Sequence, residues 1–477
     1  MDKQQPPGGI SVEEWQATPT SVRQLVLALM ATIEQLQQEV ARLREQVNQN
    51  SQNSSKPPSS DSPSVKRKPP VRKGQRKRGG QPGHRGQGRG LKPPEQVSRF
   101  VVSRPTACGA CGVLLLGEDA NPSRHQVTEL PRIEPEVIEY QVHCLRCLAC
   151  GRETRGEWPA EMPSGSFGPR LQATTGYLSG RFGVSRRDTQ EMLATLFQVE
   201  MGLGSVPAQE RRVSQALEQP VGQAQAFVRQ QPAVNVDETS WKEENHSCWL
   251  WVGSTPEVTL FLVKDTRSSQ GVKRLIGADY DGIVGSDRWS AYNWLADSQR
   301  QLCWSHLRRD FQALVDRGGD SAIIGRLLLA RVEEMFTRWH RVRGGALTRV
   351  VFQEKMHPIR REVESLLQLG SLLVKHRKTQ ATCNNILKRK VALWTFIDQD
   401  GVEPTNNAAE RALRRGVIWR RRSFGAQSQA GSCFAARILT AVISLRQQKR
   451  NVLDFLTEAC QACISGTDPP SLLPDGY

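Results

Sequence analysis

The sequence predicts a mixed α/β core preceded by several smaller modules. Beyond residue 231, short apolar runs alternate with turns and helical segments, as strands and helices do in an α/β fold. Two Cys-x-x-Cys pairs lie ahead of this region, and an apolar heptad pattern lies near the N-terminus. At about 100–200 residues per domain, a chain of 477 residues corresponds to three or four domains.

The charge of the chain is positive and locally concentrated. There are 65 Lys and Arg against 48 Asp and Glu, a net charge of +17, and eleven of the basic residues lie between Lys66 and Lys92, where no acidic residue occurs. Such a run predicts a polyanionic partner, either nucleic acid or an anionic membrane surface. No apolar run reaches the roughly 18 residues of a membrane span, and the sequence opens without a signal-peptide pattern. We therefore expect a cytoplasmic protein and exclude the secreted and membrane classes.

Residues 19–50 predict a coiled coil. Apolar residues recur at intervals of three and four, and β-branched side chains at heptad position a with leucine at d favour a parallel two-stranded coil. Two copies of the chain would then associate through this segment. The alternative is a single amphipathic helix docked on the rest of the protein. The a positions are Val26, Ile33, Val40 and Val47, and the d positions are Leu29, Leu36 and Leu43.

Residues 51–98 predict a basic disordered linker. The segment is rich in Ser, Pro, Gly, Lys and Arg and holds too few apolar residues to offset the entropy lost on ordering. Its basic half could neutralise nucleic-acid phosphates without reading sequence. The alternative is a solvated linker without a partner. The candidate phosphate contacts are Arg76, Lys77 and Arg78.

Residues 99–158 predict a small zinc-binding module. Cys108 and Cys111 form one Cys-x-x-Cys-Gly loop, and Cys147 and Cys150 form a second. Four thiolates at this spacing suit tetrahedral Zn²⁺ with no open position, so the ion would be structural. Cys144, three residues before Cys147, leaves the identity of the third ligand open.

Residues 165–222 predict a helical region. Ser185 could cap one helix, Gly202 and Gly204 break the pattern, and Ser205 could cap a second helix. Two short helices around a glycine-containing turn are compatible with a DNA-binding helix-turn-helix. Ordinary helical packing explains the pattern almost equally well.

Residues 231–425 predict the core. The expected order of elements is β-β-β-α-β-α-β, which is typical of a ribonuclease H-like α/β fold. Asp237 follows the first strand and Asp287 follows the fourth. The predicted elements are strands at 233–236, 248–252 and 258–263, a helix at 270–276, a strand at 282–285, a helix at 290–295 and a strand near 301–304.

Paired carboxylates at these positions indicate phosphodiester chemistry. Two divalent ions about 3.5–4 Å apart can activate an attacking oxygen and stabilise a leaving one, and Mg²⁺ or Mn²⁺ requires carboxylate oxygens from separate elements. Asp279 and Asp281 compete with Asp287, but they precede the buried strand and fit a turn better. Glu238 adjoins Asp237, yet a strand would direct it to the opposite face.

The third carboxylate is expected from a helix that starts near residue 404. On that helix Asn407, Glu410 and Arg414 share one face, so Glu410 could bind metal while its neighbours contact phosphate. The alternative is an exposed Glu–Arg pair. The arginines after Glu410 have guanidinium groups that fit phosphate oxygens, and Trp419 could stack on an unpaired base. The alternative is that these arginines form a solvated basic face. The candidate DNA contacts here are Asn407, Arg411, Arg414, Arg415 and Trp419.

The sequence resembles the insertion-sequence 66 family of bacterial transposases, which are DDE enzymes. Besides both Cys-x-x-Cys pairs, the motifs that carry the resemblance are GGQPGH at 79–84, VDETSW at 236–241, SDRWSAY at 286–292, CWSHL at 303–307 and NNAAER at 406–411. The resemblance implies that Asp237, Asp287 and Glu410 form the DDE triad. It also implies an α-helical insertion at about 307–394, and a C-terminal helical segment and tail remain at 426–477.

The resemblance further implies a function. The enzyme would bind the terminal inverted repeats of an insertion sequence, cleave to expose 3′-hydroxyl ends and join them to target DNA, by a cut-and-paste or copy-and-paste route. It would be nucleoid-associated, and two small accessory proteins encoded by the same element are expected partners. Cys303 and His306 resemble a Cys-x-x-His element of related transposases, although a buried, hydrogen-bonded histidine is equally expected. The alternatives are a catalytically silent DNA-binding regulator and a nuclease that cuts without joining.

Overall fold

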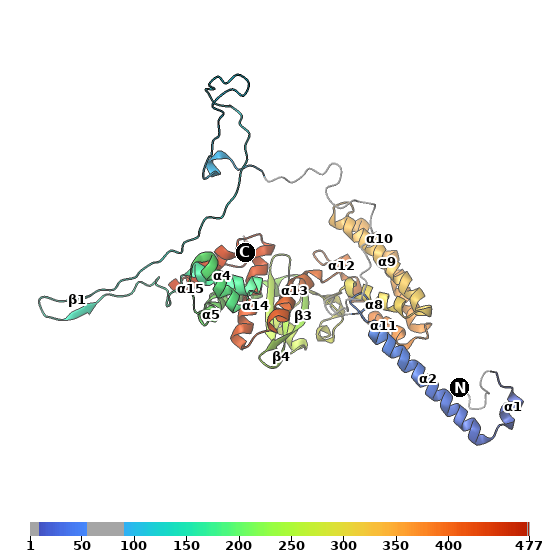
Figure 1. Cartoon of the computed structure of the whole chain (residues 1–477). Coiled ribbons are helices and arrows are strands. Elements are labelled where there is room, and N and C mark those ends of the chain that lie inside the picture. The colour runs from blue at the N-terminus through green and yellow to red at the C-terminus, as the bar shows by residue number, and fades with distance from the viewer. Residues whose placement is uncertain (1–8, 55–89, 475, 477) are drawn as a thin grey trace. The chain divides into compact units, whose positions relative to one another are not determined.

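The computed structural model describes residues 9–54, 90–474 and 476 (Figure 1). The chain divides into two units, one of Met1–Val65, Ile138–Thr195 and Val199–Tyr477, and a smaller one of Lys66–Val137 and Leu196–Gln198. Arg76, Lys77 and Arg78, with most of the predicted linker, lie outside the described residues. Among the described helices, none combines the length and apolar character needed to cross a membrane.

A five-stranded mixed sheet forms the centre of the larger unit. Its strands are ordered β5-β4-β3-β6-β7; β4 is antiparallel to both of its neighbours, β5 and β3, and β6 and β7 run parallel to β3. The predicted mixed α/β core is therefore confirmed. The strands are β3 (Ala233–Glu243), β4 (His246–Ser254), β5 (Thr259–Lys264), β6 (Ile283–Ser286) and β7 (Arg300–Leu302).

Two predicted elements of the core were wrong in extent. The first strand does not end before Asp237 but continues to Glu243, because its pairing with β4 persists through that whole length. The helix expected at 290–295 is reduced to one short 3₁₀ turn, η4 (Ser290–Tyr292), and a second 3₁₀ turn, η5 (Asp297–Gln299), lies beyond it. Tyr292 is fully buried and hydrogen-bonded to the sheet, which holds this connection in a tight turn.

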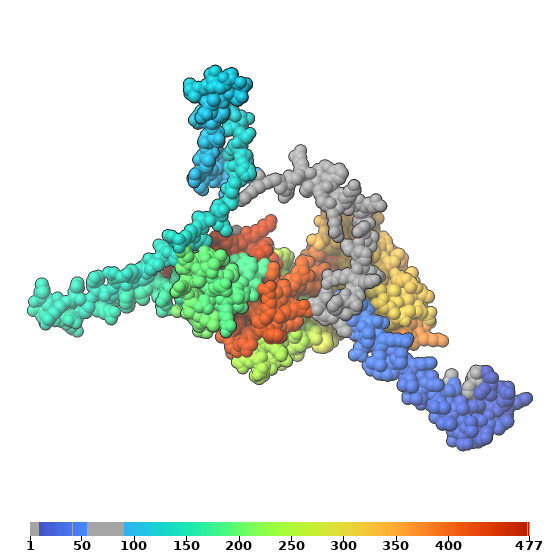
Figure 2. Space-filling view, viewed as in Figure 1, coloured from blue at the N-terminus to red at the C-terminus, as the bar shows by residue number. Residues whose placement is uncertain are grey.

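The two faces of the sheet carry different side chains, because successive residues of a strand point in opposite directions. Val234 and Val236 of β3 belong to a large core that also contains residues of helix α7 (Ser269–Ile276). Trp241, from the other face of β3, packs with Ala409 and Leu413 of helix α13 (Asn407–Ser423). Asp237 is four residues before Trp241 on the same strand, so its side chain points to the same face, the one that α13 covers. Part of α13 is visible in orange-red at the protein surface (Figure 2).

Between β7 and α13 the chain forms an all-helical segment with its own core. Buried aromatic side chains, among them Trp304, Phe311 and Trp394, hold this segment together. These helices occupy the region where the family resemblance places an insertion. They are α8 (Trp304–Asp316), α9 (Gly319–Arg343), α10 (Arg349–Leu372), α11 (Arg377–Leu387), η6 (Val391–Leu393) and α12 (Thr395–Asp398).

Other helices flank the sheet. The Oγ of Ser185 accepts a hydrogen bond from the Asp188 N–H at 3.1 Å, as predicted for a cap. Ser205, in contrast, is the first residue of its helix and not a cap, and Gly204 takes the cap position. These helices are α3 (Pro169–Tyr177), the π-helical turn η3 (Leu178–Phe182), α4 (Arg186–Phe197), α5 (Ser205–Ala216), α6 (Glu218–Gln230), α14 (Gln429–Gln447) and α15 (Val452–Ser465).

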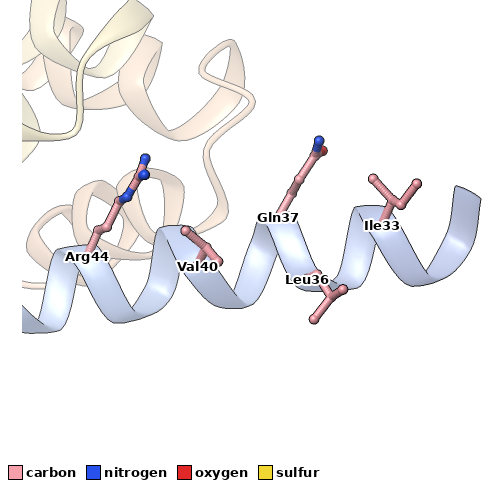
Figure 3. A pocket seen from close by; sticks show the side chains of 5 residues that line it. All are labelled: Ile33, Leu36, Gln37, Val40 and Arg44. Atoms are coloured by element: carbon pink, nitrogen blue, oxygen red, sulfur yellow. The ribbon is translucent and has the colours of Figure 1, made fainter.

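The N-terminal heptad segment is helical. After the short α1 (Val12–Ala17), α2 (Thr20–Asn48) covers nearly all of the predicted coil. Near its end, Glu45 pairs with Arg317 (Oε1 to Nε, 3.1 Å) and with Lys378. Apolar heptad side chains, including Ile33, Leu36 and Val40, are exposed along the helix (Figure 3). The predicted pairing of two copies stays a prediction.

Candidate functional site

The sheet register brings Asp237 and Asp287 together. In the parallel pair of β3 and β6, Asn235 is the partner of Gly285. Asp237 and Asp287 each lie two residues beyond that pair, and neighbouring strands are about 4.8 Å apart. Both side chains are fixed by backbone donors: the Glu238 N–H donates to Asp237 Oδ1 at 2.9 Å, and the Trp289 N–H donates to Asp287 Oδ1 at 2.9 Å.

Helix α13 supplies the third carboxylate. Its cap residue, Asn406, is buried and donates from Nδ2 to the Val236 carbonyl at 3.4 Å and from its backbone N–H to Cys303 Sγ at 3.4 Å. Glu410 follows one helical turn later, above the strand that carries Asp237. Its Oε1 is buried and lacks a hydrogen-bond donor among the described residues.

Electrostatics show that the three carboxylates interact. Burial raises the pKa of Asp237 well above its usual range, and the negative charges of Glu238, Asp287 and Glu410 raise it further. A hydrogen bond from the backbone N–H of Glu238 opposes this rise only in part. The predicted triad residues are therefore close in space, although they come from three separate parts of the chain.

Cys303 and His306 lie beside Glu410. Cys303 directly follows β7, and His306 is in the first turn of α8, with its Nδ1 3.6 Å from Glu410 Oε1. Burial lowers the pKa of His306, but the hydrogen bond and charge of Cys303 and the charges of Glu410 and Asp287 raise it to about 9. His306 is thus half-buried and next to the candidate site, and its Nδ1 has no hydrogen-bond partner among the described residues, so its role stays a prediction.

The donor groups of this region fit a divalent cation. A bound cation would offset the repulsion that the charges of Asp287 and Glu410 exert on Asp237. The buried Oε1 of Glu410 has no hydrogen-bond donor among the described residues. Hard ions such as Mg²⁺ and Mn²⁺ prefer such oxygens. Cys303, His306 and Glu410 also offer ligand atoms that lie within 4.8 Å of one another, a softer set of the kind that Zn²⁺ accepts.

Glu238 lies on the opposite face of the sheet from Asp237, as the strand alternation predicts. Its Oε1 accepts from Arg267 Nε at 2.9 Å, and its Oε2 accepts from the Tyr292 hydroxyl at 2.8 Å. These two partners are site-supporting residues that the sequence reasoning missed. Tyr292 belongs to a quoted motif, but no sequence signal connects Arg267 to Glu238.

The arginines of α13 divide into two groups. Arg411, Arg414 and Arg415 are exposed and so accessible to phosphates. Arg420 instead donates to Thr239 Oγ1 at 3.0 Å and to the Ser240 carbonyl at 2.7 Å, so it ties the helix to β3.

Two further predicted contacts already have partners within the protein. Asn407 Oδ1 accepts from Ser305 Oγ at 3.2 Å. The Trp419 ring is half-buried, with its centroid 6.3 Å from that of Trp241 and 6.1 Å from that of Phe434. Trp419 therefore has a packing role, and its stacking on a base stays a prediction.

The two Cys-x-x-Cys loops have the same local structure. In each loop, the N–H of the first cysteine donates to the carbonyl of the residue five positions later at 2.8 Å. The carbonyl of the same cysteine accepts from the N–H of the glycine four positions later, Gly112 or Gly151, at 2.8–2.9 Å. Gly112 and Gly151 adopt φ angles of 74° and 75°, which favour glycine. Hydrogen bonds from the backbone N–H groups of the second and third residues after Cys108 and Cys147 lower the pKa of these two thiols. This conformation prepares thiolates to bind a metal.

The second loop joins two short antiparallel strands, β1 (Cys144–Arg146) and β2 (Glu153–Arg155). Cys108 and Cys111 belong to the smaller unit, and Cys147 and Cys150 belong to the larger one. A zinc ion shared by the four thiolates therefore stays a prediction, as does the place of Cys144, which is in β1.

Converging carboxylates on the sheet of a mixed α/β core are the arrangement of enzymes that use divalent ions on phosphodiesters. Residues 164–433, more than half of the chain, match the model of a family described as Transposase IS66 family. The chain therefore belongs to the IS66 family of transposases, which confirms the resemblance seen in the motifs. Residues 4–90 match a family of unknown function, DUF6444.

Two curated relatives come from Sinorhizobium fredii. The uncharacterized protein y4hP is 27% identical over 396 residues, which cover 74% of this chain and 70% of the relative. The uncharacterized protein y4qI is 29% identical over 248 residues, which cover 46% of this chain and 44% of the relative.

Proposed function

We propose that this chain is a DDE transposase with a ribonuclease H-like core, which cleaves the ends of its own element and joins them to target DNA. The observation that carries the proposal is the register of β3 and β6 with the position of α13, which together gather Asp237, Asp287 and Glu410. The strand order β5-β4-β3-β6-β7, with its antiparallel and parallel halves, supports the ribonuclease H-like assignment.

The three carboxylates would hold two Mg²⁺ or Mn²⁺ ions, with Asp237 and Glu410 at one and Asp237 and Asp287 at the other. Bound there, the ions would supply activation of the attacking oxygen and stabilisation of the leaving one. Asp237 is rigidly placed in the middle of a paired strand, and Asn406 fixes the start of the helix that carries Glu410. Two of the three ligands thus lie on regular elements, and Asp287 directly follows the end of β6, which favours accurate positioning.

DNA contacts would come from several segments. Arg411, Arg414 and Arg415 are exposed on the helix that carries Glu410, where guanidinium groups can reach phosphates near the reacting bond. Asn407 and Trp419 would add contacts at the same helix, and the basic segment with Arg76, Lys77 and Arg78 would bind DNA without sequence preference. The zinc module and helices α4 and α5 would recognise the terminal inverted repeats.

Assembly would depend on two further interactions. The exposed heptad face of α2 would pair two copies of the chain, so that two element ends are held in one complex. Two small accessory proteins from the same element would act with it, as in the family. These parts of the proposal rest on the sequence pattern and on the family.

The test is Mg²⁺-dependent cleavage and strand transfer on DNA carrying the element's own ends, with Glu410→Gln beside the wild type. Glu458→Gln, the same change at an exposed position on α15, is the matched control. We expect Glu410→Gln to lose cleaved and joined products while it still binds the ends, and the control to keep both.

Other outcomes would point elsewhere. A wild type that binds the ends but neither cuts nor joins them, even with the accessory proteins added, would indicate a regulator. Cleavage without joined products would indicate a nuclease. Activity that survives in Glu410→Gln would mean that the third carboxylate is another residue.

A further inference from the structure

A buried arginine without a counter-charge lies outside the carboxylate site. Arg181 is in the π-helical turn η3, and only 9% of its surface is exposed. Its Nε and Nη1 atoms are buried and have no hydrogen-bond acceptor among the described residues. Its nearest ring contact is Phe182, whose centroid is 5.7 Å from the guanidinium carbon. Such π-helical turns are frequent at functional sites.

The other buried arginine of the described residues has hydrogen-bond acceptors for part of its guanidinium group. Arg300, which is also buried, donates to Asn293 Oδ1 and to the Asp287 carbonyl, both at 3.3 Å. Arg181 makes no ion pair with any described carboxylate. Because buried cations are normally paired, an unpaired guanidinium indicates that its partner is a group outside the chain.

The surroundings of Arg181 are positive. Burial lowers the pKa of Arg181, and the positive charges of Arg415 and Arg446 lower it further, while Tyr177 opposes this only slightly. Arg415 and Arg446 are both exposed, on α13 and at the end of α14. The positive charges of guanidinium groups from two other elements therefore act on Arg181 together, and this concentration of charge favours an anion.

The turn that carries Arg181 is held rigidly. A Cβ on Gly180 would lie 2.7 Å from Ile438 Cγ1 of α14, so the turn packs closely against that helix. From α13, Arg422 Nη1 donates to the carbonyls of Phe182 at 3.1 Å and Gly183 at 3.4 Å. These contacts connect the turn directly to the helix that carries Glu410.

We propose that Arg181, together with Arg415 and Arg446, binds a phosphate of the DNA backbone. This inference rests on the proposed function and adds a specific anchor for the DNA. An arginine can make two parallel hydrogen bonds to phosphate oxygens through Nη1 and Nη2, which would satisfy Nη1, one of the two unpaired nitrogens of Arg181. Arg415 lies five residues beyond Glu410, about 7.5 Å along the helix axis, so the phosphate lies within a few nucleotides of the reacting bond.

The test compares Arg181→Met with the wild type in two measurements on the full chain. The first is binding of a fluorescein-labelled 30-base-pair duplex, followed by anisotropy over a range of salt concentrations. We expect about five- to tenfold weaker binding. The slope of log affinity against log salt concentration should be shallower by about one, the value for one lost phosphate contact. The second is thermal unfolding without DNA, where Arg181→Met should be as stable as the wild type or more stable, because a buried unpaired charge is removed.

Controls separate this role from others. Arg326→Met removes an exposed arginine on α9 and should change neither measurement. Combining Arg181→Met with Arg415→Met should weaken binding by less than the product of the single effects, because both contact one phosphate. Unchanged DNA affinity in Arg181→Met would overturn the proposal.

Two further results would also overturn it. A clear loss of thermal stability in Arg181→Met would show that the arginine is structural. If inorganic phosphate raises the unfolding temperature of the wild type but not of Arg181→Met, while DNA affinity is equal in both, the site binds a free anion and not DNA. Because the assay measures binding, these failures leave the transposase proposal standing, whereas a wild type that does not bind DNA refutes that proposal itself.

Discussion

Replacing Arg267 with methionine should destabilise the protein, because Glu238 would be left buried without its counter-charge. The Glu238 side chain is 2% exposed, and its two oxygens accept from Arg267 Nε at 2.9 Å and from the Tyr292 hydroxyl at 2.8 Å. Burial raises the pKa of Glu238 and the charge of Asp287 adds to it, while Tyr292 and Arg267 oppose the rise. The ion pair thus holds an ionised carboxylate behind Asp237.

The size of the effect follows from the burial of the two partners. Removing one partner of a fully buried ion pair costs about 3–5 kcal/mol. Arg267 is 36% exposed, so solvent screens part of this interaction. Its guanidinium also lies 4.7 Å from the Trp249 ring centroid and 4.0 Å from that of Trp289, and these contacts add about 0.5–1 kcal/mol each. We expect Arg267→Met to lower the free energy of unfolding by about 3 kcal/mol at pH 7.

The loss should depend on pH in a defined direction. Without Arg267 the folded-state pKa of Glu238 rises further above its unfolded value, so ionised Glu238 opposes folding. This penalty is complete above the folded pKa and disappears as pH falls toward the unfolded value, where the carboxyl is protonated in both states. The difference between Arg267→Met and wild type should therefore shrink on acidification.

A double-mutant cycle measures the interaction directly. Urea unfolding of wild type, Glu238→Gln, Arg267→Met and the double variant should give a coupling energy of about 2 kcal/mol. The matched control is Arg308 with Glu333, a pair at 2.7 Å whose side chains are 57% and 65% exposed, where the coupling should stay below about 0.5 kcal/mol. An equally small coupling for Glu238 and Arg267 would refute the reasoning.

Three further predictions concern separate parts of the chain. Gly425→Ala should lower the free energy of unfolding in urea by about 3 kcal/mol, because φ is +116° and a Cβ would lie 2.2 Å from the Lys242 carbonyl oxygen; unchanged stability would contradict this. Cys111→Ser and Cys150→Ser should each lose the single zinc ion measured by elemental analysis, and retention of full zinc in either would exclude a shared site. Leu36→Asp should convert a dimer to a monomer in sedimentation, because it places a charge in the heptad seam; an unchanged sedimentation coefficient would contradict the coil.

The strands and helices of the core were largely predictable, because an element that is buried on one or both faces has a regular spacing of apolar residues in its sequence. The exception was the first strand, which was expected to end before Asp237. A carboxylate in a strand looks like the end of a buried segment, but β3 continues because its pairing with β4 does not depend on which side chains are apolar. The helix expected from Ser290 was also wrong, since local sequence does not reveal that Tyr292 is drawn into the core.

The candidate site was predictable in part. Asp237 and Asp287 follow from their positions near two strands that are expected to be neighbours, and the structure places them in adjacent strands. Glu410 needed the family resemblance, because 122 residues separate it from Asp287 and no local pattern specifies which helix returns to the sheet. Arg181 and Arg267 could not be predicted at all, because their roles depend on what lies around them in three dimensions.

In the proposed function, helix α13 would combine packing, metal binding and DNA binding in one element. Its Gly416 lies so close to the sheet that a Cβ there would be 2.2 Å from Leu250 Cδ2, and Ala409 and Leu413 are buried against the same face. A helix held this closely places Glu410 directly over β3 and leaves Arg414 on its exposed side. In the proposed function, metal ligand and phosphate contacts would share one rigid helix, so DNA bound by the arginines would be positioned relative to the carboxylates without any loop in between.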